Sequence, residues 1–357
     1  MANQQETAGR AVHCVIHTPL AYLCLREYLA LYPYAERFLY VLASSPTSAH
    51  QIEELCRADR WSGFEVLGKG RESGLVGKAK ALLDLVARRR KLSAMLARMR
   101  PQDDLVLTHL RNPYARWIVK HRKGKRPIIA IDEGTTTLVE FEILSEHGRI
   151  TLKNSAQRFP TIFKKIENRM FSSSDIESRQ LAFFSFWPLD VLATPRSPQV
   201  FGTNPLALIR QTGRAKMQSR EAFVFGQPFV RAGHLSAADY ASILDDIADH
   251  YAQRGVRMVY FPHRNEDAGP DPEKYEIRRL SEPFELYYMR SPERPAFIGG
   301  FFSAAMLTTY YLDGKDLVFD FFWQYEQLQE KRAQNRQIEM LVAHELANGA
   351  QFTIHEG

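Results

Sequence analysis

Short apolar runs alternate along the chain with longer segments in which apolar residues recur every three or four positions. In the first part of the chain the apolar runs predict strands over residues 11–16, 38–42, 64–67, 105–107 and 128–131. The segments between them predict helices that begin at Pro19 and that cover residues 49–57 and 76–99. Strands that alternate with helices are typical of a parallel sheet covered on both faces.

The alternation becomes irregular between Phe141 and Ser219 and then returns. In this second region we expect strands over residues 222–225, 256–261, 284–289 and 296–298, a helix over 236–254 with Ser236 as its N-cap, and a terminal helical segment over 320–348. Two similar α/β halves are the architecture of GT-B glycosyltransferases. The predicted fold is therefore α/β of the GT-B kind, two Rossmann-like domains facing across a cleft, with domains at 1–215 and 216–357. Fold by itself does not set function.

The composition is that of an ordinary globular protein, with 45% hydrophobic and 25% charged residues in 357. Cys14, Cys24 and Cys56 show neither paired nor zinc-type spacing, which suits a reducing compartment. No run of about 18 apolar residues predicts a transmembrane helix. The polar start, Met1–Gly9, lacks the apolar core of a signal peptide. We therefore expect a cytoplasmic protein.

The net charge of +6 permits an acidic partner such as a nucleotide, an anionic glycan or a phospholipid surface. Basic residues gather at 88–91 and 121–126. Both patches are typical of solvated helix faces or loops, and peripheral contact with an anionic membrane or glycan is the alternative. Because aromatic residues are not ordered among the basic ones, the patches do not indicate nucleic-acid binding.

Polar side chains follow three of the predicted strands. Asp132, Glu133 and Gly134 come directly after the strand at 128–131. A carboxylate at the end of a buried strand can have a raised pKa and serve as a general base. The alternative is an acid that only caps a helix or closes a turn.

A second polar group follows the strand at 256–261, where Pro262 ends the strand and His263 and Arg264 come next. An imidazole and a guanidinium at this position are suited to bind phosphate. Alternatively, the histidine contacts a loop carbonyl and the arginine pairs with Glu266 or Asp267. Ser303 follows the third such strand, and it can cap the next helix and also donate to an anion at the helix N-terminus.

Metal and nucleotide-loop motifs are absent from the sequence. Gly77-Lys78 lacks the earlier glycine of a phosphate loop, and His344-Glu345 lacks the second histidine of a zinc-protease helix. An enzyme that holds a metal on a nucleotide diphosphate is expected to have an Asp-x-Asp motif after a strand, and this sequence has none there. We therefore expect no metal and no other cofactor.

These motifs, in this order, resemble those of the bacterial lipooligosaccharide sialyltransferases and capsular polysialyltransferases. Asp132-Glu133-Gly134 is similar to the acidic motif of these families, and Ser303 is similar to their serine motif near the C-terminus. The intermediate His-Pro motif departs, because here Pro262 precedes His263 and Arg264 follows it. Further similarities cover most of the chain; they are His17-Thr18-Pro19-Leu20, Phe225-Gly226-Gln227-Pro228 and Pro283-Phe284-Glu285.

The resemblance implies an inverting, metal-independent glycosyltransferase that transfers a sialic acid or related nonulosonic acid from a CMP-activated donor to a surface glycan. It implies the following roles: Asp132, Glu133 and His263 in catalysis; Gly226, Gln227, His263, Arg264 and Ser303 in binding the CMP donor; and His17, Thr18 and Asn112 on the acceptor side. Asp132 would be the base, with Glu133 as its neighbour or substitute.

Two other readings stay open at this point. One is a GT-B transferase with another donor, such as CMP-Kdo or a nucleotide diphosphate sugar. The other is a non-catalytic assembly protein at a membrane surface. The sequence is compatible with a peripheral location at the inner membrane and with a homodimer, but no motif in it predicts either.

Overall fold

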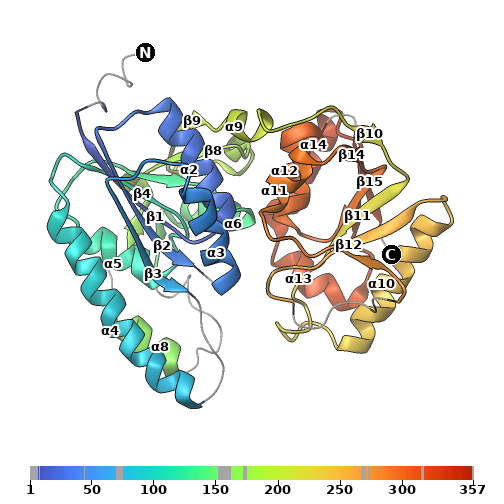
Figure 1. Cartoon of the computed structure of the whole chain (residues 1–357), viewed down its shortest axis with the longest axis horizontal. Coiled ribbons are helices and arrows are strands. Elements are labelled where there is room, and N and C mark those ends of the chain that lie inside the picture. Colours follow the sequence, from blue (N-terminus) through green and yellow to red (C-terminus); the bar gives the residue numbers. More distant parts are fainter. Residues whose placement is uncertain are drawn as a thin grey trace. The chain divides into compact units, whose positions relative to one another are not determined.

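The computed structural model describes residues 7, 9–43, 45–69, 75–151, 162–171, 175–266, 271, 273–314 and 317–355. The chain forms two compact units, unit 1 over Met1–Leu206 and unit 2 over Ala207–Gly357 (Figure 1). The sequence suggested a division after residue 215, and the structure divides after residue 206. Asp267, a suggested partner of Arg264, lies outside the described residues.

Unit 1 contains a parallel sheet of seven described strands in the order β3-β2-β1-β4-β5-β8-β9. The strands are β1 (Ala11–Ile16), β2 (Glu36–Ala43), β3 (Gly63–Lys69), β4 (Asp104–Leu107), β5 (Ile128–Ile131), β8 (Leu181–Ser185) and β9 (Gln199–Thr203). The first five confirm the strands predicted from the apolar runs. β8 and β9 lie in the stretch that looked irregular, and they complete the sheet.

Helices cover both faces of this sheet. They are α2 (Pro19–Leu31), α3 (Pro46–Cys56), α4 (Leu75–Arg98), α5 (Pro113–His121), α6 (Thr135–His147) and α8 (Ile162–Met170), with short 3₁₀ turns η1 (Ser178–Gln180) and η2 (Leu189–Leu192). In Figure 1, α2 and α3 lie on one side of the sheet, and α4 and α5 lie on the other. A two-stranded antiparallel pair, β6 (Arg149–Ile150) and β7 (Ile176–Glu177), stands apart from the sheet.

The face of the sheet under α2 and α3 carries a continuous apolar core. Val12, Cys14 and Ile16 of β1 and Leu39 and Val41 of β2 contribute to it and are completely buried. The capping prediction at the first helix is confirmed: the Thr18 hydroxyl accepts a hydrogen bond from the Ala21 backbone at 3.2 Å, and Pro19 begins the helix. This packing fixes the direction in which the chain leaves β1.

Unit 2 contains a second parallel sheet, with six described strands in the order β13-β12-β11-β15-β16-β17. These are β11 (Glu221–Phe225), β12 (Arg257–Phe261), β13 (Glu276–Ile277), β15 (Phe297–Gly300), β16 (Val318–Phe322) and β17 (Phe352–His355). A separate parallel pair joins β10 (Met217–Gln218) to β14 (Glu293–Arg294). The helices are α9 (Ala207–Arg210), α10 (Ala237–Ala252), α11 (Phe284–Arg290), α12 (Ala304–Asp313), α13 (Gln329–Ala333) and α14 (Arg336–Ala347), with the 3₁₀ turn η4 (Glu326–Leu328). The predicted Ser236 cap of α10 is confirmed.

Two predicted elements of unit 2 are wrong. Residues 284–289 form helix α11 and not a strand. Because most of its side chains are buried, the helix has no polar face that would reveal its periodicity, and a short apolar run of this kind reads equally well as a strand. The predicted helical segment over 320–348 begins too early, since Asp320 lies in the middle of strand β16. A charged residue there interrupts the apolar run.

Both sheets follow the Rossmann pattern. Each sheet starts with a central strand, β1 or β11, and the next strands of the chain are added on one side of it. The order of addition then reverses, and β4 or β15 is added, still parallel, on the other side of the central strand. The predicted α/β class with two Rossmann-like halves is therefore confirmed. In such sheets ligands bind outside the carboxyl ends of the strands, at the point where the order reverses. That point is β1/β4 in unit 1 and β11/β15 in unit 2.

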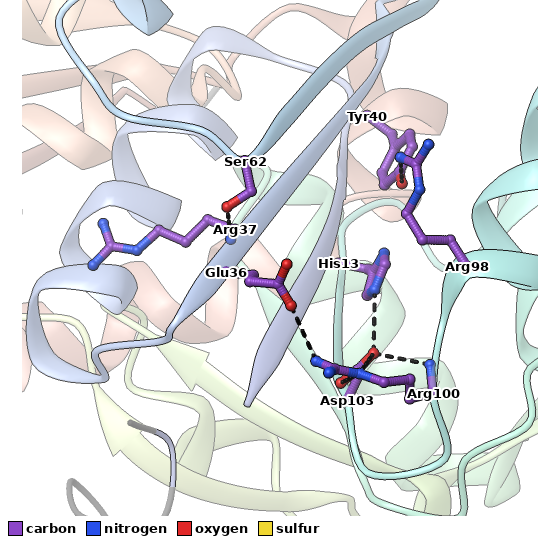
Figure 2. Close-up of polar contacts among 8 residues, drawn as sticks. All are labelled: His13, Glu36, Arg37, Tyr40, Ser62, Arg98, Arg100 and Asp103. Atoms are coloured by element: carbon purple, nitrogen blue, oxygen red, sulfur yellow. Dashed lines mark hydrogen bonds and ion pairs between the residues drawn. The ribbon is translucent and has the colours of Figure 1, made fainter. Parts of the chain in front are cut away.

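The opposite, amino end of the β1/β4 pair holds a buried histidine beside a buried aspartate (Figure 2). The His13 ring is completely buried and stacks on Phe38 with ring centroids 4.8 Å apart. Its Nε2 lies 3.5 Å from an Asp103 oxygen, and Asp103 also accepts a hydrogen bond from the Arg100 backbone at 2.8 Å. These contacts join the starts of the two strands.

Among the described helices, none is both long enough and apolar enough to span a bilayer.

Candidate functional site

The carboxyl ends of β1, β4 and β5 bring two histidines and a glutamate together in unit 1. His17 follows β1, His109 follows β4, and Glu133 follows β5. The Glu133 carboxylate lies 3.7 Å from His17 Nδ1 and 3.9 Å from His109 Nδ1, measured to its two different oxygens. The two imidazole rings have centroids 5.4 Å apart. This group, which we call the unit 1 cluster, stands at the reversal point of the sheet.

The hydrogen bonds around His17 fix its proton. Asn112 Oδ1 accepts from the Tyr114 backbone as the N-cap of α5, so the amide nitrogen of Asn112 is the atom that faces His17 Nε2, at 3.3 Å. An amide nitrogen can only donate, so Nε2 accepts and the proton of the ring is on Nδ1. That proton is donated to Thr108 Oγ1 at 2.9 Å. Burial, and secondarily the nearby His109, hold the pKa of His17 well below its ordinary value, so the ring is neutral at pH 7.

Asp132 has different surroundings from its neighbour Glu133. Its side chain is completely buried, and its two oxygens accept hydrogen bonds from Ser185 Oγ at 2.6 Å and from the Phe186 backbone at 2.8 Å. Burial raises the pKa of Asp132 to about 7, although both hydrogen bonds act to lower it. These contacts tie the end of β5 to the end of β8. Thr18, which the resemblance placed on the acceptor side, is the N-cap of α2.

The backbone at the two strand ends takes unusual conformations. Gly134, the N-cap of α6, has a φ of 68°, and His109 has a φ of 53°. The left-handed region is uncommon for a residue with a side chain and costs about 1–3 kcal/mol where the structure enforces it. The buried Glu140 of α6 accepts a hydrogen bond from the Arg111 backbone at 2.8 Å and so holds the chain just after His109. Burial raises the pKa of Glu140 to about 7.

In unit 2 the predicted donor residues follow three neighbouring strands. Gly226 and Gln227 come after β11, His263 after β12 and Ser303 after β15. Since these strands are hydrogen-bonded neighbours in the order β12-β11-β15, their carboxyl ends stand side by side. We call these residues the unit 2 cluster. It stands at the reversal point of the second sheet.

A chain of hydrogen bonds through buried tyrosines of α10 and β12 stabilises the loops that follow β11 and β12. The Gln227 backbone donates to Tyr240 Oη at 2.9 Å, Tyr240 Oη lies 2.9 Å from Tyr260 Oη, and Tyr260 donates to Glu266 at 2.5 Å. The other Glu266 oxygen accepts from the His263 backbone at 2.9 Å. Glu266 is thus the anchor of the loop after β12.

Gly226 is required by this packing. A β-carbon at position 226 would collide with the hydroxyl of Tyr260 and with a carboxylate oxygen of Glu266. The backbone nitrogen of Gly226 also donates to the Phe261 carbonyl at 2.9 Å. The ends of β11 and β12 are therefore held together without an intervening side chain.

His263 presents its second nitrogen as a donor. Its Nδ1 accepts a hydrogen bond from the Asn265 backbone at 3.1 Å, so the proton of the neutral ring is on Nε2. Burial, and then the charge of Arg264, lower the pKa of His263 to about 4. Arg264 itself is exposed. The ring is therefore a hydrogen-bond donor at neutral pH rather than a cation.

Ser303 is the N-cap residue of α12, and within the described part of the chain its hydroxyl accepts no capping hydrogen bond. The side chain is nearly buried, at 8% exposure. A hydroxyl beside the first backbone N–H groups of a ten-residue helix suits an anion, because these groups have no partner within the helix. Nearby in sequence, Glu285 of the predicted Pro-Phe-Glu motif lies buried in the first turn of α11, and burial raises its pKa.

The sequence analysis missed His109 and Thr108. Both follow the strand predicted over 105–107, so the rule that identified the other candidates applied to them as well. The basic patches are used within unit 1: Arg88 donates to Tyr114 at 3.2 Å, Lys91 pairs with Glu65 at 3.2 Å, and Arg126 pairs with Asp104 at 2.7 Å. These contacts favour the structural reading of the patches.

No protein-family model and no curated protein matches the chain. Solved structures do match. A UDP-N-acetylglucosamine 2-epimerase aligns with 11% identity and a TM-score of 0.45, over 89% of this chain and 80% of that one. A UDP-GlcNAc 2-epimerase from Methanocaldococcus jannaschii in complex with UDP-GlcNAc and UDP aligns with 10% identity and a TM-score of 0.45, over 93% and 92%. The sialyltransferase resemblance therefore stays a prediction.

Proposed function

We propose that this protein is an inverting glycosyltransferase that transfers a sialic acid or related nonulosonic acid from a CMP-activated donor to a glycan hydroxyl. The observation that supports it most directly is the arrangement of Gly226, His263 and Ser303 on three neighbouring strand ends at the reversal point of the unit 2 sheet. Groups of three kinds that can donate hydrogen bonds follow these strands: a helix N-terminus, a hydroxyl and an imidazole N–H.

The unit 2 cluster would hold the phosphate of CMP. His263 would donate from Nε2, Ser303 from its hydroxyl, and α12 from its first backbone N–H groups. Hydrogen bonds from these groups would stabilise the charge that develops on the departing phosphate. Because the pKa of His263 is lowered to about 4, the ring would act by hydrogen bonding and not by proton transfer. CMP carries one phosphate, so we expect no metal requirement.

The unit 1 cluster would activate the acceptor. Glu133 is the better candidate for the base, because both oxygens of Asp132 already accept hydrogen bonds in a completely buried position. The two ring nitrogens of His17 are held by Thr108 and Asn112, so the neutral ring would line the site beside Glu133 and leave the Glu133 carboxylate to accept from the acceptor hydroxyl. In one displacement the acceptor oxygen bonds to the anomeric carbon, the bond from that carbon to the phosphate oxygen breaks, CMP leaves with the electron pair, and Glu133 takes the hydroxyl proton.

The experiment that tests the proposal is release of CMP from CMP-sialic acid in the presence of a chelator. We expect release by the wild type and by His344→Ala, a control in the last turn of α14, and loss of both release and CMP affinity in His263→Ala. CMP binding without release would point to another CMP-sugar such as CMP-Kdo. Absence of CMP binding would contradict the proposal and favour a different donor or the non-catalytic assembly protein.

A further inference from the structure

A second cluster of polar side chains in unit 2 has no place in the proposed reaction. It consists of His250 near the end of α10, Asp320 in β16 and His355 at the end of β17. One possible ligand atom from each residue lies within 4.8 Å of the others. β16 is separated from the unit 2 cluster's central strand β11 by β15.

Asp320 is an unusual residue for the middle of a parallel strand. Its side chain is completely buried, and it lies between the strands β15 and β17. One oxygen accepts from Tyr251 Oη at 3.1 Å, and the same oxygen lies 3.7 Å from the Arg254 guanidinium. The other oxygen faces His355 Nε2 at 3.1 Å. The carboxylate is therefore oriented by Tyr251 and Arg254 through one oxygen and presents its second oxygen to His355.

His250 supplies the observation that hydrogen bonding within the protein does not explain. Among the described residues, its Nε2 is one of the buried side-chain atoms without a hydrogen-bond partner. Its ring stands nearly perpendicular to that of His355, at 85°, with centroids 4.7 Å apart. His355 is in turn held by stacking on Phe322, with centroids 4.7 Å apart and planes 8° apart. A buried polar atom without a partner calls for an explanation such as an ion.

We infer that His250, Asp320 and His355 bind a divalent transition-metal ion of the zinc class. Two imidazoles and a carboxylate are a common ligand set for such ions, with water in the fourth position. In a tetrahedral site with bonds of about 2.0–2.1 Å, ligand atoms stand roughly 3.3 Å apart. The His355–Asp320 separation of 3.1 Å is close to that value. Only His250 has to approach by a small side-chain movement.

The contacts around the ligands agree with a metal site. Tyr251 and Arg254 bind the Asp320 oxygen that faces away from His355, which is the arrangement by which second-layer groups orient a metal ligand. The Arg254 side chain is 42% exposed, so its charge is partly screened by water. The ion would join α10 to the edge strand β17, and so it would stabilise unit 2 rather than take part in sugar transfer.

The test is titration of chelator-treated, dialysed protein with Co²⁺, followed by its visible absorption and by competition with Zn²⁺. We expect one Co²⁺ per chain in the wild type and an affinity more than about 10-fold lower in His250→Ala and in His355→Ala, since even loss of a second-layer group costs about 10- to 100-fold. His344→Ala, a histidine outside the cluster, should bind as the wild type does.

Thermal unfolding provides a second readout that does not depend on activity. Zn²⁺ should raise the unfolding midpoint of the wild type and of His344→Ala, and should leave that of His250→Ala unchanged. His250→Ala is preferred to an Asp320 variant because Asp320 also binds Tyr251 and Arg254. Circular dichroism of each metal-free variant checks that it is folded. Equal Co²⁺ affinity in the wild type and His250→Ala, or no Zn²⁺ effect on the wild type, would overturn the assignment.

Discussion

At the scale of single residues, the adjacent carboxylates Asp132 and Glu133 show how position decides role. Successive residues at a strand end point to opposite sides. Asp132 enters the protein and accepts from Ser185 and Phe186, whereas Glu133 lies beside two imidazoles. The raised pKa of Asp132 follows from burial and not from closeness to a substrate. A raised pKa by itself is therefore an insufficient sign of a general base.

This difference leads to a prediction for two variants. Glu133→Gln should keep the fold and lower turnover by about 10²- to 10⁴-fold, the usual contribution of a general base. Asp132→Ala should instead lower the free energy of unfolding by about 1–3 kcal/mol, because the buried Phe186 N–H loses its acceptor. Turnover per folded molecule and urea unfolding are the measurements. If Asp132→Ala abolished turnover while Glu133→Gln retained it, Asp132 would be the base.

At the scale of elements, β1 and β4 are joined at both ends by polar contacts. Their carboxyl ends carry the unit 1 cluster, and their amino ends carry His13 and Asp103 (Figure 2). Burial is the main cause that lowers the pKa of His13; Asp103 acts in the opposite direction, and Arg98 and Arg100 lower it further. The folded protein therefore keeps His13 neutral over a range in which an unfolded histidine takes up a proton.

A pH dependence of stability follows from the His13 environment. A folded-state pKa below the ordinary 6.5 means that the unfolded chain binds more protons, so stability is complete above pH 6.5 and falls as the pH drops below it. His13→Phe retains a ring against Phe38 but cannot titrate. Its unfolding free energy should fall less steeply below pH 6.5, by up to about 1.4 kcal/mol per pH unit.

The measurement is urea unfolding of His13→Phe and wild type between pH 7.5 and 5.5, values that bracket the ordinary histidine pKa by about one unit. His147→Ala is the control, because its side chain is 57% exposed. Parallel curves for His13→Phe and wild type would show that His13 does not contribute to the acid sensitivity.

At the scale of the whole molecule, each unit repeats one design. Its sheet reverses direction beside the first strand, and its polar residues follow the strands on either side of the reversal. The unit 1 cluster offers a carboxylate and imidazoles, which suit a hydroxyl acceptor. The unit 2 cluster offers N–H and O–H donors, which suit a phosphate. This division of chemistry between the units is the basis for the proposed acceptor binding in unit 1 and donor binding in unit 2.

This division predicts which backbone amides CMP will protect from hydrogen exchange when it binds to the full chain. In hydrogen exchange, CMP should protect backbone amides around 226–227, 263–266 and 303–306, and leave those around 108–112 and 133–137 unchanged. The physical reason is that a bound nucleotide suppresses the openings of the loops that hold it. The same experiment on His263→Ala should show no protection. Protection confined to the unit 1 residues would reverse the assignment of the two units.

The sequence by itself determined the class of fold, most of the described strands in the two large sheets, and the strand ends that carry polar chemistry. Apolar runs and helical periodicity are local signals, and they identify β1, β11 and their neighbours without any knowledge of packing. Caps such as Thr18 and Ser236 are local as well, which is why they were predictable. The same rule reaches Thr108 and His109, so their omission was not a limit of the sequence.

The tertiary structure alone decided the order of the strands and the direction of each side chain. Strand order depends on contacts between residues far apart in the chain, such as Asp132 with Ser185, so the reversal points could not be read from local patterns. Helix α11 was misread because burial removed its polar face. The His250, Asp320 and His355 cluster joins three segments separated by up to 105 positions in the printed numbering. Pairing of β16 with β17 brings Asp320 and His355 together, and packing of His250 of α10 against Phe322 of β16 adds the third residue.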